Sequence, residues 1–280
     1  MPGHVKNQVP AETPSTDRLT TIEDADCPVL LLPNRLSKGL HGTPHNHRKG
    51  QLIYPIQGRF RVRTVGRIWV GSPQQAMWIP PGVVHQVEAL DDLDVHNVYV
   101  RTEEIEGLPS ACKVLNVPPL LRELLTFGLT LPTSYQQVTE HLRIMLAITD
   151  QIRLADDMAN LHLPTSDDRR LRPILSFMIE HPDDNRSLED WADFTNSSTR
   201  TLARLFIQET GLTFRQWRQR LRMMEALPRL SDGQSVLTVS MDLGYASQSA
   251  FATVFRKIIG QLPSEFALRG RYDRLPRMVE

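Results

Sequence analysis

The sequence has few cysteines and no long apolar segment. Only two cysteines, Cys27 and Cys112, occur in 280 residues, which excludes the disulfide framework typical of small secreted domains. No uninterrupted apolar run approaches the roughly 18 residues that a membrane-spanning helix needs. Residues 1–18 contain no apolar stretch typical of a secretion signal. These absences predict a cytoplasmic protein with reduced thiols and no membrane partner.

The chain also has no net charge, since 32 basic residues balance 32 acidic ones. The balance conceals an asymmetry, because residues 1–168 carry a net charge of −4 and residues 169–280 carry +4. The basic part is rich in arginine, and Lys257 is its only lysine. This asymmetry favours a polyanionic partner for one part of the chain, although a charge of +4 over 112 residues establishes none by itself.

The residue pattern changes along the chain, which predicts several domains. Between residues 28 and 100, short apolar runs alternate with glycine and proline, a pattern typical of a β-sandwich or barrel. Helical periodicity follows at 118–127 and 134–155, and again after a polar stretch. In chain order we expect a flexible tail, a β-barrel, a helical dimerisation region, a linker and an all-helical domain: 1–18, 19–110, 111–162, 163–168 and 169–272.

The C-terminal part contains an internal repeat with an offset of 49 residues. The segment Ser198–Gly211 matches Ser247–Gly260, and each has a serine where a helix should begin and a glycine where it should end. A further short helix and a tight turn precede each copy, which is the helix-turn-helix pattern. One copy alone would be explained equally well as an ordinary helical hairpin. Two copies joined by an arginine-rich helix at 214–227 favour DNA binding.

These segments resemble the DNA-binding domain of the AraC/XylS family. The most specific match is LGYASQSAFATVFR at 243–256. Ser240 departs from the alanine usual in the family, and Pro228 is expected to end or kink the joining helix near Leu227. The resemblance implies double-stranded DNA as a partner, and RNA polymerase as a second one if the protein is an activator. On the joining helix we expect either a solvated face or phosphate contacts from Arg215, Arg218, Arg220 and Arg222.

In the AraC/XylS family the second helix of each unit enters the major groove. Arginine suits the O6 and N7 atoms of guanine, and glutamine suits the N6 and N7 atoms of adenine. A contact to phosphate alone is the alternative, and for Arg204 the two readings are equally open. Matching position by position, the resemblance assigns DNA contacts to Thr199, Arg200, Ala203 and Arg204 in the first helix and to Gln248, Ser249, Ala252 and Thr253 in the second.

The β-rich part contains a candidate metal site. His45, His47 and Gln51 lie an even number of residues apart, so a strand would place them on one face. Together with the PPGVVH sequence that ends at His85 they resemble the cupin motifs, except that Gln51 replaces the usual glutamate. The resemblance implies that residues 19–110 form a cupin-like β-barrel that senses an effector. Three imidazoles can hold Ni, Zn, Fe or Cu. Two alternatives remain: the histidines line a metal-free pocket, or His45 and His47 lie in a flexible loop.

Two classes of function fit a cupin-like barrel, namely a sensor of transcription and a metal-dependent enzyme such as a dioxygenase or isomerase. The repeat favours the regulator, because an enzyme has no use for two helix-turn-helix units. We therefore expect no catalysis, and no cofactor required for DNA binding. The HxH motif, residues 78–85 and residues 163–169 resemble AraC-type regulators of neighbouring efflux genes, including the nitroimidazole-resistance group. A homodimer responding to a small molecule or metal is expected, with activation and repression both open.

Overall fold

The computed structural model describes residues 16–73, 75–135, 138–155 and 162–272. The chain divides into two compact units, of which the first contains residues 1–61 and 71–156 and the second residues 62–70 and 157–280. Most of the expected tail at 1–18 lies outside the described residues, but helix α1 (Thr16–Asp24) already begins within it. Among the described residues, no helix is both long and apolar enough to span a membrane.

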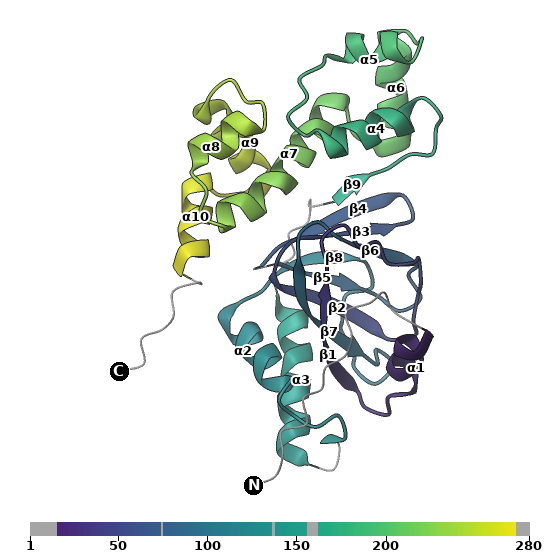
Figure 1. Cartoon of the computed structure of the whole chain (residues 1–280), viewed down its shortest axis with the longest axis vertical. Coiled ribbons are helices and arrows are strands. Elements are labelled where there is room, and N and C mark those ends of the chain that lie inside the picture. Colours follow the sequence, from purple (N-terminus) through teal and green to yellow (C-terminus); the bar gives the residue numbers. More distant parts are fainter. Residues whose placement is uncertain (1–15, 74, 136–137, 156–161, 273–280) are drawn as a thin grey trace. The chain divides into compact units, whose positions relative to one another are not determined.

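Two sheets make up the β-rich part (Figure 1). One has the strand order β1-β7-β2-β5-β8 and the other the order β6-β3-β4-β9. Every pair in the first sheet is antiparallel, and so is the pair β4–β9 in the second. The bounds are β1 Val29–Leu36, β2 Gly50–Gln57, β3 Phe60–Thr64, β4 Arg67–Gly71, β5 Gln75–Ile79, β6 His85–Ala89, β7 Leu93–Val100, β8 Lys113–Asn116 and β9 His162–Pro164.

Buried apolar side chains of the first sheet pack against two helices. Strand β2 has six consecutive buried residues and β5 is buried throughout, which explains why apolar residues there run on instead of alternating. Helices α2 (Pro119–Gly128) and α3 (Thr139–Leu154) contribute Leu121, Leu125, Met145 and Ile148 to the same core. The expected helices at 118–127 and 134–155 agree with these elements, apart from a later start of α3.

The second unit is mainly helical. Both copies of the sequence repeat form a short helix, a turn and a longer helix, as the repeat predicts. The second helix of each copy begins at a serine whose side chain accepts a backbone N–H, and ends at a left-handed glycine. The bounds are α4 Leu171–Glu180, α5 Leu188–Phe194, α6 Thr199–Thr210, α7 Phe214–Ser231, α8 Val236–Asp242, α9 Gln248–Ile259 and α10 Pro263–Tyr272. The expected class, a β-rich domain plus a helical double helix-turn-helix domain, is confirmed.

Three expectations about this part of the chain are wrong in detail. The linker expected at 163–168 begins inside strand β9, where Leu163 is buried opposite Ile68 of β4. The helical region expected at 111–162 contains strand β8 and the start of β9. Helix α7 continues past Pro228 to Ser231, because a proline near a helix end removes only one N–H donor and the chain there is buried.

Candidate effector site and nucleic-acid interface

Three histidines that are far apart in sequence converge in the first unit. His45 and His85 face each other across a two-residue antiparallel bridge, in which each backbone N–H donates to the other's carbonyl at 3.0 and 2.9 Å. The carbonyl of His47 accepts the N–H of Gly82 at 2.9 Å, which fixes the loop after the bridge. One ring nitrogen from each histidine lies within 4.8 Å of the others. The cluster brings together the histidines that the sequence singled out.

Nδ1, the outer nitrogen of each ring, is hydrogen-bonded to a main-chain oxygen. Nδ1 of His45 lies 2.9 Å from Thr43 O, Nδ1 of His85 lies 2.9 Å from Val83 O, and Nδ1 of His47 contacts Lys49 O. A carbonyl oxygen only accepts hydrogen bonds, so each Nδ1 must carry the proton. In the neutral rings Nε2 then has a free lone pair. This arrangement, with a carbonyl holding the outer nitrogen, is typical of histidines that bind metals.

Gln51 completes the cluster with its amide oxygen. Its Nε2 donates to Asn97 Oδ1 at 2.9 Å and to Tyr99 OH at 3.3 Å, so Oε1 faces the ring of His47. Oε1 and His47 Nε2 are 3.0 Å apart, and with the proton on Nδ1 both atoms are acceptors. A second proton on the ring or a cation beside both atoms removes this conflict.

Burial favours the neutral form of His45 and His85. His85 is 1% exposed, and desolvation lowers its pKa from the ordinary value to about 3. Desolvation also lowers the pKa of His45, and the neighbouring ring of His47 lowers it further. His85 Nε2 has no hydrogen-bond partner among the described residues, although it is buried. A buried, unprotonated imidazole nitrogen without a donor facing it is chemically suited to coordinate a metal and unsuited to bind an anion.

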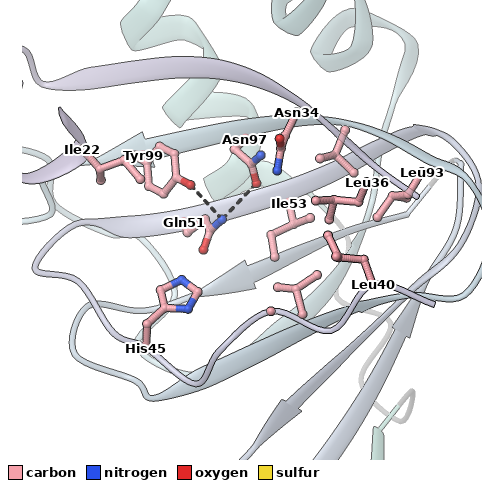
Figure 2. Close-up of a pocket in the computed structure, with 13 residues that line it drawn as sticks. Ile22, Asn34, Leu36, Leu40, His45, Gln51, Ile53, Leu93, Asn97 and Tyr99 are labelled. Carbon is pink, nitrogen blue, oxygen red and sulfur yellow. Dashed lines mark hydrogen bonds between the residues drawn. The ribbon is translucent and has the colours of Figure 1, made fainter. Parts of the chain in front are cut away.

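A cavity of about 50 Å³ lies beside the cluster and is drawn in Figure 2. Polar groups from His45, Gln51, Asn97, Tyr99 and Asn34 line one part of it. Gly42 and apolar side chains from α1, β1, the following loop, β2, β6 and β7 form the remaining lining: Ile22, Leu36, Leu40, Ile53, Val87, Leu93 and Val95. The cavity therefore suits a compact, mostly apolar molecule with a polar group at the Gln51 end.

Sequence reasoning missed Asn97 and Tyr99, which hold Gln51 in place. Both lie on β7, where Tyr99 is the register partner of Gln51 and Asn97 that of Ile53. A buried asparagine in the apolar strand sequence LDVHNVYV was a usable signal, because a buried amide needs hydrogen-bond partners. Which partners it takes depends on the strand register.

The candidate DNA-contacting side chains lie on the outer face of α6 and α9. Arg200 and Arg204 of α6 are exposed, whereas Thr199 and Ala203 are half-buried. The two arginines line a shallow hollow together with Thr201, Ile207 and Gln208, and the sequence analysis did not single out Gln208. On α9, the exposed candidates are Gln248, Ser249 and Thr253, and Ala252 is half-buried.

The turns before the two helices share one geometry but differ in length. Asn196 in the first turn and Gly244 in the second adopt positive φ angles of 51° and 72°. The next N–H closes the turn in both copies, from Ser197 to Ala192 O and from Tyr245 to Ser240 O at 2.8 and 3.0 Å. The second turn then has one more residue, Ala246, before its helix-capping serine. A left-handed residue at this position explains why asparagine and glycine occur there.

Two family models match the chain in succession. Residues 36–163 match the AraC-like ligand binding domain, and residues 191–269 match the Helix-turn-helix domain. The HTH-type transcriptional regulator NimR of Escherichia coli is 35% identical over 225 residues, which cover 80% of this chain and 82% of NimR.

Other relatives match less of the sequence. The Arabinose operon regulatory protein of Escherichia coli is 32% identical over 109 residues, or 38% of this chain and 37% of that protein. Among solved structures, ToxT from Vibrio cholerae covers 86% of this chain and 98% of its own, with 12% identity and a TM-score of 0.35.

Proposed function

Because the chain belongs to the AraC family of DNA-binding transcription regulators with a ligand-binding domain, we propose that the three-histidine cluster and its cavity form the sensor site. The family resemblance carried by the sequence motifs is thereby confirmed. The observation that carries the proposal is the orientation of three imidazoles. Each Nδ1 atom is held by a carbonyl oxygen, and one ring nitrogen of each histidine lies within 4.8 Å of the others, beside a mostly apolar cavity.

Four residues would hold a divalent transition metal: His45, His47 and His85 through nitrogen and Gln51 through its amide oxygen. Neutral nitrogen and oxygen ligands suit Ni, Zn, Fe and Cu alike, so the donor set leaves the choice among them open. Such an ion supplies a Lewis-acidic position for an electron-rich group of the effector. Asn97 and Tyr99 orient Gln51 for this role, and the apolar lining excludes water from the rest of the effector.

Elemental mass spectrometry of the purified protein tests the metal. We expect about one metal per chain in the parent and little in His47→Ala. His41→Ala is the matched control, because His41 is exposed and pairs with Glu88 outside the cluster. If the parent takes up no metal after incubation with Ni, Zn, Fe or Cu, the metal assignment is wrong. The histidines would then line a metal-free pocket, and a ligand screen would start from apolar and aromatic compounds.

On DNA, we propose that α6 and α9 enter neighbouring major grooves. One chain therefore contacts two short base sequences, here called boxes, about one helical turn apart. The exposure of Arg200, Arg204 and Gln248 on these helices supports this assignment. An effector changes promoter output only if its affinity for the arrangement of the protein that binds DNA differs from its affinity for the arrangements that do not. A footprint with and without effector, together with a reporter for the neighbouring efflux or metabolic genes, distinguishes activation from repression.

We propose that the protein acts as a homodimer in the cytoplasm, without catalytic activity. Apolar side chains on the surface of the α2–α3 pair support a second copy as partner, since Leu120 and Phe127 of α2 are 57% and 51% exposed and lie two helical turns apart on one face. Light scattering should show that Leu120→Glu converts dimers to monomers. Val65→Glu, at an apolar residue elsewhere that is 90% exposed, should not. The regulator relatives support the absence of catalysis.

A further inference from the structure

Arg222 of α7 is buried, although the sequence places it among arginines expected on a solvated or phosphate-binding face. Its residue exposure is 5%. The prediction is therefore wrong for this residue, because its side chain turns inward between the two helix-turn-helix units. Arg218, one turn earlier on the same helix, is half-buried, and Arg215 is exposed.

The guanidinium group of Arg222 binds elements of both helix-turn-helix repeats at once. Towards the first repeat, Nε donates to Pro182 O at 2.9 Å and Nη2 donates to three oxygens of the loop that precedes α5. Towards the second repeat, Nη1 donates to Gly244 O at 3.4 Å, in the turn between α8 and α9. The acceptors of Nη2 are Asp183 O at 3.3 Å, Asp184 O at 3.0 Å and Asn185 Oδ1 at 3.0 Å.

The two helix-turn-helix repeats also approach each other directly at this point. A Cβ atom added to Gly244 would lie 2.7 Å from Asp183 O, 2.8 Å from Asn185 Nδ2 and 2.9 Å from Arg222 Nη2. The ring of Tyr245 lies beside the guanidinium, with its centroid 5.4 Å from Cζ. Gly244 thus has two constraints, its positive φ angle and this close approach, and Arg222 fills the remaining space between the loop and the turn.

Only arginine can make this set of contacts from α7. The guanidinium carries five N–H donors in one rigid plane, which matches acceptors spread over two segments. A lysine in the same place has its donors on one nitrogen and cannot reach both segments. Every acceptor is an amide oxygen and none is a carboxylate, so the contacts depend on where the two backbones lie.

We propose that Arg222 is a positioning residue that fixes the spacing of α6 and α9, and with it the number of base pairs between the two boxes that one chain contacts. The inference depends on the proposed roles of α6 and α9 in DNA binding. One base pair changes the separation of two boxes by about 3.4 Å and their relative orientation by about 35°. Two recognition helices held rigidly should therefore discriminate strongly between spacings, and loosely held ones should not.

The test uses the full chain and duplexes selected by it from a random pool. Duplexes with both boxes are then made with the selected spacing and with one base pair removed or added, and their affinities are measured at fixed salt concentration. For the parent we expect a loss of about tenfold or more on each shift, comparable to a mismatch. For Arg222→Gln and Arg222→Lys we expect this loss to shrink to about threefold or less. Affinity for duplexes that keep one box should change by about twofold at most.

Arg218→Gln is the matched control. Arg218 donates to Arg186 O at 2.8 Å and stacks on Phe214, so these contacts lie within the first helix-turn-helix repeat and α7. This variant should keep the spacing preference of the parent, whatever its overall affinity. Thermal unfolding checks that each variant is folded. If Arg222 variants do not fold, Asn185→Ala and Gly244→Ala replace them, because each alters one side of the same junction.

Folded Arg222, Asn185 or Gly244 variants that keep the parent's spacing preference overturn the proposal, even if their affinity falls uniformly. The failure of the proposed function gives a different result. If duplexes with both boxes do not bind, or if a footprint places another surface on the DNA, the roles of α6 and α9 are wrong independently of Arg222.

Discussion

The two units present their candidate functional side chains in opposite ways. In the first, His45, His47 and His85 point inward, and a backbone carbonyl fixes each ring before any ligand arrives. In the second, Arg200 and Arg204 point outward from a helix whose position is fixed by capping and burial of its other face. The fold thus preorganises the atoms of the proposed sensor site but only the backbone of the proposed DNA-binding surface. Specificity should be rigid at the first and adaptable at the second.

Removing a ligand from the inward site is the change with the largest expected effect. We expect His85→Ala to lower metal affinity by at least about 100-fold, because the ring supplies a buried lone pair that nothing nearby can replace. Competition with a chromogenic chelator measures the affinity. Because the chain divides into two compact units, we expect the affinity of His85→Ala for single-box DNA to stay within about twofold of the parent's. A large loss of both would show that the histidines support the whole protein, and the contrast between the units would then be wrong.

Removing an outward arginine should have an intermediate effect. Arg200→Ala should cost about 1–3 kcal/mol of binding free energy and relax specificity at one base pair if the guanidinium contacts a guanine. A contact to phosphate would instead weaken all sequences alike and reduce the salt dependence by about one charge. Binding to a panel of single-base duplex variants separates these outcomes. Glu209→Ala, at another exposed residue of α6, is the control and should leave the base preference unchanged.

Restoring the carboxylate that cupin motifs usually have would sharpen the contrast. Gln51→Glu adds a negative charge beside His47 without changing the size of the side chain, so metal affinity should rise by about tenfold. The same exchange removes the donor to Asn97 Oδ1 and Tyr99, so the apo protein should lose stability while the metal-bound protein gains it. Thermal unfolding with and without metal measures both effects. Equal destabilisation in the two states would argue against Gln51 as a ligand.

The smallest expected effect concerns His162, a half-buried histidine of the second unit. Desolvation, with help from Arg67 and Arg220, lowers its pKa to about 4. The unfolded chain takes up this proton near pH 6.5, so stability from the neutral ring is present above pH 6.5 and is lost as the pH falls toward 4. Allowing for partial exposure, the loss is roughly 1 kcal/mol. Thermal unfolding at pH 7 and 5 should show a smaller pH dependence for His162→Gln than for the parent.

Local sequence features predicted the helix-turn-helix units and the convergence of the three histidines. Ser198, Gly211, Ser247 and Gly260 act on neighbouring residues, so their positions in the sequence were enough to place α6 and α9. The cupin-like spacing likewise placed His45, His47 and His85 together, because the motif reflects a fixed bridge between two segments.

Features that depend on distant partners were not predictable in this way. Asn97 reaches Gln51 only through the register of β7 against β2. Arg222 lies in the same arginine-rich sequence as the exposed Arg215 and the half-buried Arg218, and its burial follows from two loops that lie 40 residues before it and 22 after it. Strand β9 is three residues long and has no periodicity of its own, so only its partner β4 defines it as a strand.

Strand β9 determines how a protein of this kind can be divided. Trp217 of α7 is fully buried and donates from its indole nitrogen to Pro164 O at 2.8 Å, while the ring of His162 lies against Trp69 with a centroid separation of 4.9 Å. A C-terminal fragment cut at Arg169 would leave that indole without its acceptor and would lose the buried Leu163. A DNA-binding module transferred to another sensor, by recombination or by engineering, therefore has to include residues 162–164 and a strand for them to pair with.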